Sequence, residues 1–151
     1  MAGNGKSVRL GEGEYRWLEK GLRGMGFFAK LSLKELAGVL PYIHLEDHPK
    51  GRVLCKEGGK GDSFFLIYKG GVEVSKKNWD KPVAKLKEGQ FFGEMSLLFG
   101  HPRNATVKTL KPTQLFELKA NDFSRILKKN PGVAKTVRKV ADERRRALAQ
   151  I

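Results

Sequence analysis

Residues 92–107 read FGEMSLLFGHPRNATV, and this stretch interrupts an otherwise strand-rich part of the chain. Gly93 and Gly100 bracket a segment long enough for one or two helical turns, and Pro102-Arg103 leads directly into an alternating segment typical of a strand. The stretch therefore predicts a short helix embedded in a β-barrel.

The start of such a helix suits an anion. Its first N–H groups have no partner within the helix, and the helix dipole adds about 0.3–1 kcal/mol in favour of a negative charge. Arg103 supplies a planar guanidinium that matches two phosphate oxygens. Glu94, on the same helix, would accept hydrogen bonds from hydroxyls such as those of a ribose. The two residues together predict a sugar phosphate as the ligand.

Around this helix the apolar pattern has a period of two. The expected strands are Ile43–Glu46, Arg52–Lys56, Phe64–Tyr68, Val72–Lys76, Val83–Lys87, Thr106–Leu110 and Gln114–Leu118. The alternation of Leu115 and Glu117 with Phe116 and Leu118 is typical of a strand with one solvent-exposed face. The predicted fold is mainly β with flanking helices, an antiparallel jelly roll over about residues 43–118.

Helices are expected on both sides of the jelly roll. Up to about residue 40 the chain is expected to be helical, and the first helix carries apolar residues at steps of three and four: Tyr15, Leu18, Leu22 and Met25. Ser32 and Glu35 have capping-box spacing and begin a second helix that Pro41 ends. Phe27 and Phe28, between the two helices, are expected in the core.

The C-terminal helices are expected over about residues 120–150. Asn121 is a candidate N-cap, and Asn130-Pro131-Gly132 separates two helices. The last helix has a seam at steps of three and four, made of Val133, Val137, Val140, Arg144, Ala147 and Ile151. We expect an N-terminal helical segment at 1–26 and the main domain at 27–151.

The composition bounds the function. The chain has 151 residues, of which 40% are hydrophobic, and its 30 Lys+Arg against 16 Asp+Glu give a net charge of +14. This charge admits nucleic acid, an acidic protein, an anionic membrane or a phosphate ligand as partner. Ten Lys+Arg and three Asp+Glu fall in residues 119–151, so half of the net charge lies on the predicted C-terminal helices. This distribution suggests an acidic protein partner that docks on them.

Several classes are disfavoured. The single Cys55 and the scattered His44, His48 and His101 make neither a disulfide framework nor a metal spacing, so no metal is expected. No membrane span or secretion signal is present, which predicts a soluble, cytoplasmic setting. No catalytic set emerges, and no enzyme activity is predicted. DNA binding is disfavoured because the sequence shows no helix-turn-helix.

These residues carry a family resemblance. Residues 92–107 resemble the phosphate-binding cassette of the cyclic nucleotide-binding domain, roughly F-G-E-x-[AS]-L-[LI]-x-x-x-P-R-[AST]-A-[TS]-V. Upstream, Glu57-Gly58, Gly61-Asp62 and the run from Phe65 to Val74 also match the family pattern. The resemblance covers about residues 27–150. The chain is similar to the cyclic nucleotide-binding domains of bacterial cyclic nucleotide-gated channels and of protein kinase A regulatory subunits.

The resemblance implies roles for individual residues. Glu94 would bind the ribose 2′-hydroxyl with help from the backbone of Gly93 and Met95, and Arg103 would pair with the cyclic phosphate. The backbone N–H groups of Asn104 and Ala105, with Ser96 as a further candidate, would complete the anion cradle. The base would meet Val74 and Leu86, and Arg144 matches a position from which the bacterial channels cap the purine.

Asn104 departs from the family pattern, which has Ala, Ser or Thr at this position. In cGMP-selective members a threonine here faces the guanine amino group. Asn104 could read that group or bond only phosphate oxygens. The resemblance favours cAMP, because it is the commoner ligand of the family, with cGMP as the alternative; neither is a cofactor.

Simpler interpretations exist for the same residues. Glu94 and Arg103 could form a surface ion pair, and Arg144 could be a solvated charge. Cys55 is expected to be a buried apolar residue and His101 a turn residue.

The expected function is a cyclic nucleotide sensor whose C-terminal helices move and signal to a partner protein or a tethered effector domain. The alternative is a basic nucleic-acid-binding or scaffold protein with an idle nucleotide pocket.

Overall fold

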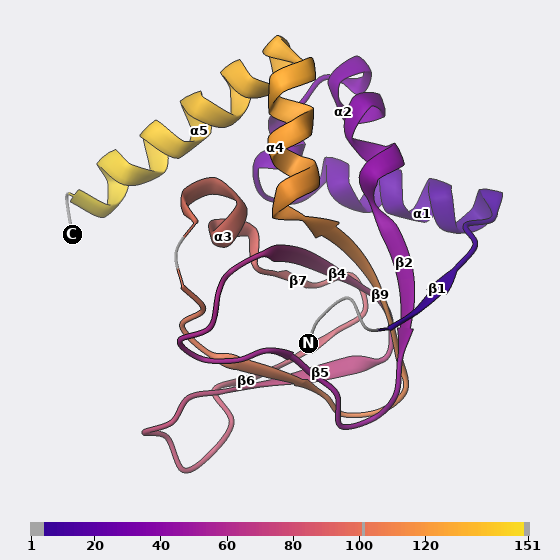
Figure 1. The fold of residues 1–151 in the computed structure, drawn as a ribbon, viewed down its shortest axis with the longest axis vertical. Coiled ribbons are helices and arrows are strands. Elements are labelled where there is room, and N and C mark those ends of the chain that lie inside the picture. The colour runs from indigo at the N-terminus through magenta and orange to yellow at the C-terminus, as the bar shows by residue number, and fades with distance from the viewer. Residues whose placement is uncertain (1–4, 101, 150–151) are drawn as a thin grey trace. The chain divides into compact units, whose positions relative to one another are not determined.

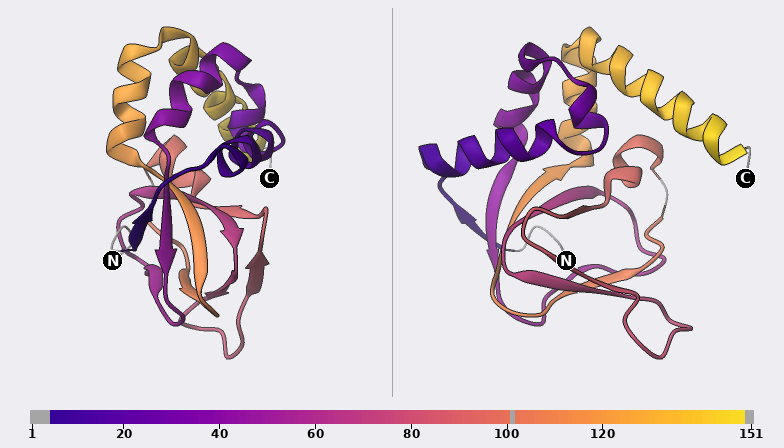
Figure 2. Two further views of the ribbon diagram at one scale, coloured as in Figure 1. Left: turned by 90° about the vertical axis from the view of Figure 1, so that its right-hand side faces the viewer. Right: turned by 180° about the vertical axis from the view of Figure 1, so that it is seen from behind.

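The computed structural model describes residues 5–100 and 102–149. The chain divides into two compact units. Unit 1 combines the N-terminal residues through Leu10 with Ile43–Ala120, and it holds the strands (Figures 1 and 2). Unit 2 combines Gly11–Tyr42 with the segment from Asn121 onward, and it is helical. Within the described residues, no helix is long and apolar enough to span a bilayer.

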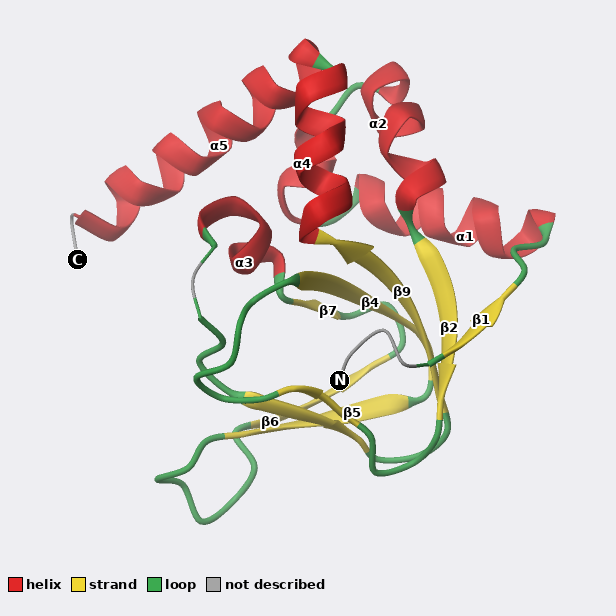
Figure 3. Cartoon of the chain, in the orientation of Figure 1, coloured by secondary structure: helices red, strands yellow, loops and turns green. Residues whose placement is uncertain are grey.

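Unit 1 is an antiparallel jelly roll (Figure 3). Its described strands are β1 (Lys6–Val8), β2 (His44–His48), β3 (Val53–Cys55), β4 (Ser63–Lys69), β5 (Gly71–Ser75), β6 (Ala84–Lys87), β7 (Phe91–Phe92), β8 (Thr106–Thr109) and β9 (Thr113–Lys119). One sheet has the order β1-β2-β9-β4-β7 and the other β3-β8-β5-β6. The predicted mainly-β fold is confirmed. Each of the seven predicted strands matches an observed strand, and their ends differ by no more than two residues.

The core of unit 1 is made of alternate side chains from both sheets. Its buried members are Leu54, Cys55, Phe65, Ile67, Val72, Val107 and Leu115. Phe92 stacks on Phe65 with the ring centroids 5.0 Å apart, and β7 pairs with β4 at the edge of the first sheet. The period-two pattern of the sequence places these residues on inward faces because successive side chains of a strand point to opposite sides.

Two expectations for the strands were wrong. Lys6–Val8 is not helical but forms the edge strand β1, whose residues pair with those of β2. β9 does not have the predicted solvent-exposed face: Leu115, Phe116 and Leu118 are buried, and Glu117 is only 2% exposed. The reason is that β9 is a central strand between β2 and β4, and the Glu117 carboxylate has a buried donor, the Ser63 hydroxyl, at 2.5 Å.

Unit 2 is built from helices at both ends of the chain. They are α1 (Glu12–Arg23), the 3₁₀ turns η1 (Gly26–Lys30) and η2 (Leu40–Tyr42), α2 (Leu33–Val39), α4 (Ala120–Lys129) and α5 (Pro131–Ala149). The capping box of α2 is present: the Ser32 hydroxyl accepts from the Glu35 N–H at 3.1 Å, and the Glu35 carboxylate accepts from the Ser32 N–H at 2.9 Å. Phe27 and Phe28 are buried as expected.

The N- and C-terminal helices of unit 2 share a core. The rings of Phe27 and Phe123 lie with centroids 5.4 Å apart, and α5 contacts η1. Other buried members are Leu18, Leu22, Met25, Leu36, Val39, Ile126 and Val133. The amphipathic pattern of each helix therefore packs on the other helices of the same unit.

Several helix boundaries differ from the prediction. Tyr15 is 39% exposed and is not on the buried face of α1, and Met25 is buried but lies beyond the end of that helix. Asn121 lies inside α4, which already begins at Ala120, so it is not the N-cap. α2 ends at Val39 and passes into η2, which contains Pro41. Helix ends are set by local geometry that propensity defines only to within a residue or two.

The break between α4 and α5 is confirmed. α4 ends at Lys129, Asn130 donates from Nδ2 to the Ile126 carbonyl at 3.1 Å, and α5 begins with Pro131. On the predicted seam of α5, Val133, Val137 and Val140 are buried and Arg144 is half-buried. The side chain of Ala147 and the residues His101 and Ile151 lie outside the described part of the chain.

Candidate functional site

A short helix, α3 (Glu94–Phe99), interrupts the strands of unit 1 as the sequence predicts. Glycines in the left-handed region cap both ends, Gly93 with φ +88° and Gly100 with φ +65°. Most residues with a side chain avoid this region, so glycine is the default here. α3 packs on β4 of the first sheet.

Arg103 is fixed at its backbone. Its N–H donates to the Gly59 carbonyl at 2.8 Å, and its own carbonyl accepts from the Gly58 N–H at 2.7 Å. The glycine-rich turn after β3 and the segment before β8 therefore hold each other in place. The Glu57-Gly58 motif thus lies in the turn whose backbone hydrogen-bonds to Arg103.

The guanidinium of Arg103 is fixed as well. Nη1 donates to the Ser96 hydroxyl at 3.1 Å, and Nη2 donates to the carbonyl oxygen of Ser63. The residue is only 9% exposed. These contacts join α3, β4 and the arginine into one arrangement, in which a charged group is held at the edge of a cavity.

Glu94 is the first residue of α3 and is 7% exposed. Because both Glu94 and Arg103 are buried, an ordinary surface ion pair does not describe them. A carboxylate in the first turn of a helix is favoured by the helix dipole.

The cavity has a volume of about 430 Å³, within the range of about 300–1,000 Å³ usual for small-molecule sites. Its lining consists of Cys55, Val74, Phe91, Phe92, Gly93, Glu94, Ser96, Pro102, Arg103, Asn104, Ala105 and Val107. Sheet residues give an apolar wall, and the 93–105 segment gives polar groups of both charges. Such a cavity suits a ligand with an anionic group, hydroxyls and a flat apolar part.

Seven of the ten predicted site residues line this cavity, namely Gly93, Glu94, Ser96, Arg103, Asn104, Ala105 and Val74. Met95 belongs to α3, but its side chain lies outside the described part of the structure. Leu86 is not among the described lining residues; it is half-buried, pairs with Val72 and packs on the core of unit 1. Arg144 lies on α5 of unit 2. The roles given to Leu86 and Arg144 stay predictions.

Five lining residues were not predicted from the sequence: Cys55, Phe91, Phe92, Pro102 and Val107. Phe92 and Pro102 stand inside the quoted motif, and Val107 continues the inward alternation of Ala105, so a signal for these three was present. Cys55 lines the cavity because β3 pairs with β8 and brings it opposite Val107. No local sequence pattern shows this pairing. Burial raises the pKa of the Cys55 thiol to about 11, so it is a neutral apolar wall residue, as expected.

The chain is similar to several known proteins. A family model described as the cyclic nucleotide-binding domain matches residues 45–130. A cyclic nucleotide-gated potassium channel of Rhizobium etli is 40% identical over 78% of this chain and 32% of the channel. The cAMP-dependent protein kinase regulatory subunit of Pyricularia oryzae is 32% identical over 74% of this chain and 29% of the subunit.

A solved structure has the same fold. The regulatory domain of Toxoplasma gondii PKA, crystallised with cAMP, superposes with a TM-score of 0.71 and 29% identity, covering 78% of this chain and 46% of that one. The chain thus spans about a third of the length of the two curated relatives. The matched residues include the whole of the cavity lining, and the chain belongs to the cyclic nucleotide-binding domain family.

Proposed function

We propose that this chain is a cyclic nucleotide sensor that binds cAMP in the cavity of unit 1 and signals through its C-terminal helices. The observation that carries the proposal is the buried Arg103, held by Ser96 and Ser63 at the edge of the cavity that Glu94 also lines. We infer a binding and regulatory role and no catalysis.

The phosphate would bind at Arg103. A guanidinium has five N–H groups, and the hydrogen bonds of Arg103 to Ser96 and Ser63 use two of them, so the others would donate to a cyclic phosphate. The backbone N–H groups of Asn104 and Ala105 would add to this cradle. Glu94 would accept from the ribose 2′-hydroxyl, and the apolar wall around Val74 would receive the base.

The preference for cAMP over cGMP rests on similarity. The Toxoplasma gondii domain was crystallised with cAMP, and the Pyricularia oryzae relative is a cAMP-dependent kinase subunit. Asn104 lines the cavity and is exposed, which supports a contact with the ligand. The proposal is therefore tighter binding of cAMP, with measurable binding of cGMP.

The signalling element would be unit 2 as a body. α4 and α5 share a core with α1 and η1 through Phe27 and Phe123, so movement of the C-terminal helices would carry the N-terminal helices along. Binding can bias such a movement only through different affinities for two arrangements. The receiver would be a partner protein or a tethered effector domain, for which the basic C-terminal segment suggests acidic character.

The test is isothermal titration of cAMP and cGMP into the wild type and Arg103→Ala. We expect saturable binding that Arg103→Ala weakens by about thirtyfold or more, because a buried charged partner of the phosphate is removed. Arg103→Lys keeps the charge without the planar fork and should fall between the two. Arg125→Ala, at an exposed arginine of α4, is the matched control and should bind normally.

Two outcomes would overturn the proposal. One is cAMP affinity that Arg103→Ala leaves unchanged while circular dichroism shows the variant folded. The other is strongly salt-dependent DNA binding with no response to either nucleotide, as the idle-pocket alternative requires.

A further inference from the structure

The connection between β5 and β6 concentrates positive charge. Residues 76–87 read KKNWDKPVAKLK, with five lysines and one aspartate, and we call this segment the basic hairpin. Its lysines are Lys76, Lys77, Lys81, Lys85 and Lys87. All are exposed except Lys76, which is half-buried. None of these lysines belongs to the cavity described above.

Apolar side chains stand among these lysines. Trp79 is 62% exposed and Val83 is 42% exposed, which makes them two of the five large exposed hydrophobic residues in the described part of the chain. An exposed indole and an exposed valine in one short loop are apolar groups that a partner could cover.

The hairpin tip is an ordered projection. The Trp79 N–H donates to the Lys76 carbonyl at 3.1 Å, and the Val83 N–H donates to the Val74 carbonyl at 2.7 Å, which closes the base of the loop. The Lys77 N–H donates to the Glu57 carboxylate at 3.0 Å. Figures 1 and 3 show the loop between β5 and β6 extending away from the sheets of unit 1. The backbone of the loop is thus held by its own hydrogen bonds.

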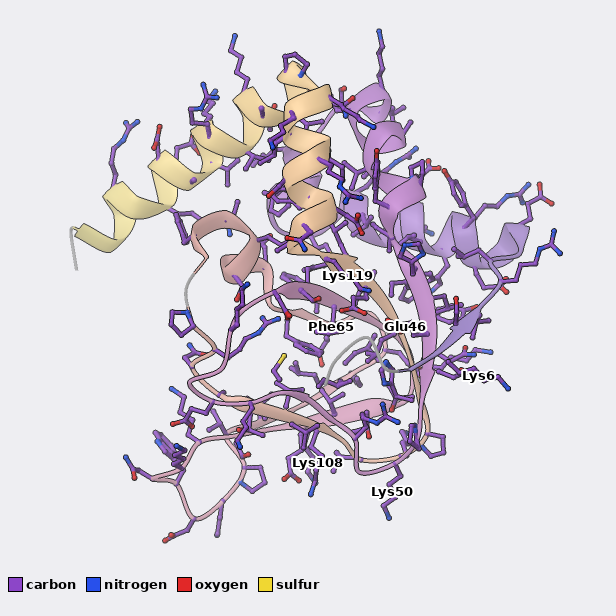
Figure 4. All side chains as sticks on the ribbon, in the orientation of Figure 1. Lys6, Glu46, Lys50, Phe65, Lys108 and Lys119 are labelled. Atoms are coloured by element: carbon purple, nitrogen blue, oxygen red, sulfur yellow. The ribbon has the colours of Figure 1, made fainter. Side chains whose placement is uncertain are left out.

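Positive charge continues on the sheet behind the hairpin. Glu73 of β5 stands in register between Lys85 of β6 and Lys108 of β8. Lys108 and Lys50 are exposed and point outward, whereas the side chains of Glu46 and Phe65 are buried (Figure 4). Across these three strands, two lysines, Lys85 and Lys108, flank the single Glu73.

We propose that the basic hairpin docks this domain on the surface of anionic lipid bilayers. Trp79 and Val83 enter the headgroup region, where an indole ring is favoured, and the lysines face the anionic headgroups. Lysine suits this arrangement because its stem packs along apolar surface while its ammonium stays in water.

The composition of the hairpin favours lipid over nucleic acid. It has one aromatic residue, whereas binding of single strands uses several stacking rings. Val83 and Pro82 would find no apolar counterpart on a phosphate backbone. A bilayer interface accommodates both the apolar tip and the surrounding charge.

The experiment uses the Trp17→Phe variant, in which Trp79 is the remaining one of the chain's two tryptophans. Its emission is measured with vesicles of phosphatidylcholine alone and of phosphatidylcholine with phosphatidylserine, in the absence of nucleotide. We expect a blue shift and protection from an aqueous quencher only with phosphatidylserine, and loss of both at high salt.

Sedimentation with the same vesicles tests the residues. Trp79→Ser and the double variant Lys77→Glu/Lys81→Glu should each lower partitioning by about tenfold or more. Leu33→Ser removes an apolar side chain that is 64% exposed on α2, and Lys34→Glu/Lys128→Glu makes the same charge change elsewhere. These matched controls should retain most of the binding.

The proposal fails if Trp79 shows no shift with phosphatidylserine vesicles, or if the control variants lose as much binding as the hairpin variants. It also fails if a DNA oligonucleotide or an acidic peptide protects Trp79 where the vesicles do not. Arg103→Ala changes the nucleotide cavity and leaves the hairpin unchanged, so this variant should bind vesicles like the wild type. Vesicle binding and nucleotide binding can therefore fail independently of each other.

Discussion

The guanidinium of Arg103 lies directly against Gly93: a β-carbon built on this glycine would be 2.6 Å from Nη1 and 2.5 Å from the Ser63 carbonyl oxygen. Real β-carbons do not approach other heavy atoms so closely. The turn that begins α3 and the arginine therefore fit together only because residue 93 has no side chain.

Gly93→Ala should damage both stability and ligand binding. The φ of +88° costs an alanine about 1–2 kcal/mol, and the overlap with Arg103 and Ser63 adds about 1–3 kcal/mol. Displacement of the guanidinium should also weaken cAMP binding by about tenfold or more. Urea denaturation and isothermal titration measure the two effects.

Gly89→Ala separates backbone strain from the overlap. Gly89 has nearly the same φ, +84°, but its β-carbon would meet no atom within 4 Å. This variant should lose only about 1–2 kcal/mol of stability and bind nucleotide normally. Equal losses of affinity in the two variants would contradict the role given to the Gly93–Arg103 contact.

Ser96→Ala tests whether the arginine needs its partner on α3. The Ser96 hydroxyl is buried and accepts from Nη1 of Arg103, and a hydrogen bond to a charged group contributes about 1.5–3 kcal/mol. We expect a loss of stability of that size and nucleotide binding weakened by about tenfold. Ser124→Ala, at an exposed serine of α4, should change neither quantity. Wild-type affinity in folded Ser96→Ala would show that Ser63 alone positions the guanidinium.

Local patterns explain why so much of unit 1 could be predicted. The alternation around Val72 and Phe65 and the glycine-rich turns define strands without knowledge of their partners, because side-chain period and turn chemistry are properties of neighbouring residues. The cassette motif then identified the polar half of the cavity, from Gly93 to Ala105.

Features that depend on distant pairing could not be predicted in this way. The wall formed by Cys55 requires its register with Val107, and β1 exists only because Lys6–Val8 meets the edge of β2. Glu117 looked like a solvent-facing residue because its acidic side chain alternates with apolar ones. Its burial follows from the partners that β4 and β2 bring to it, which lie far away in the sequence.

Glu117 and Glu46 form a buried pair of carboxyl groups. Burial, then the hydrogen bond and the negative charge of Glu117, together raise the pKa of Glu46 to about 8, against the opposing charge of Lys119. Glu46 is 7% exposed and Glu117 2%. The folded protein therefore keeps the Glu46 proton at neutral pH, whereas the unfolded chain, with a pKa near 4.5, releases it.

The stability of the protein should fall as the pH rises through this range. Between pH 4.5 and about 8 the folded state binds more protons than the unfolded state, so the free energy of unfolding declines by at most about 1.4 kcal/mol per pH unit. His48 acts in the opposite sense below pH 6.5, because burial and the Arg52 charge lower its pKa. The Glu46 effect is therefore cleanest from pH 6.5 to 8.

Glu46→Gln should remove this dependence. The amide can donate to Glu117 as the protonated carboxyl does, but it has no proton to lose. Urea denaturation at several pH values between 6.5 and 8 should give a falling free energy for the wild type and a nearly constant, higher one for the variant. Glu143→Gln, at an exposed residue of α5, should keep the wild-type slope. A wild-type stability that stays flat or rises over this range would contradict the buried proton.

Asn104 offers the sharpest test of ligand choice. Asn104 lines the cavity, at the position where the family resemblance implies a threonine in cGMP-selective members. A threonine hydroxyl there could accept a hydrogen bond from the guanine amino group. Asn104→Thr should strengthen cGMP binding relative to cAMP by about two- to tenfold, the contribution of one hydrogen bond. Titration of both nucleotides measures the ratio, and Asn104→Ala is the control that removes the amide without adding the hydroxyl. If alanine shifts the ratio as far as threonine does, Asn104 itself excludes cGMP, and the selectivity comes from its bulk or its contact with phosphate.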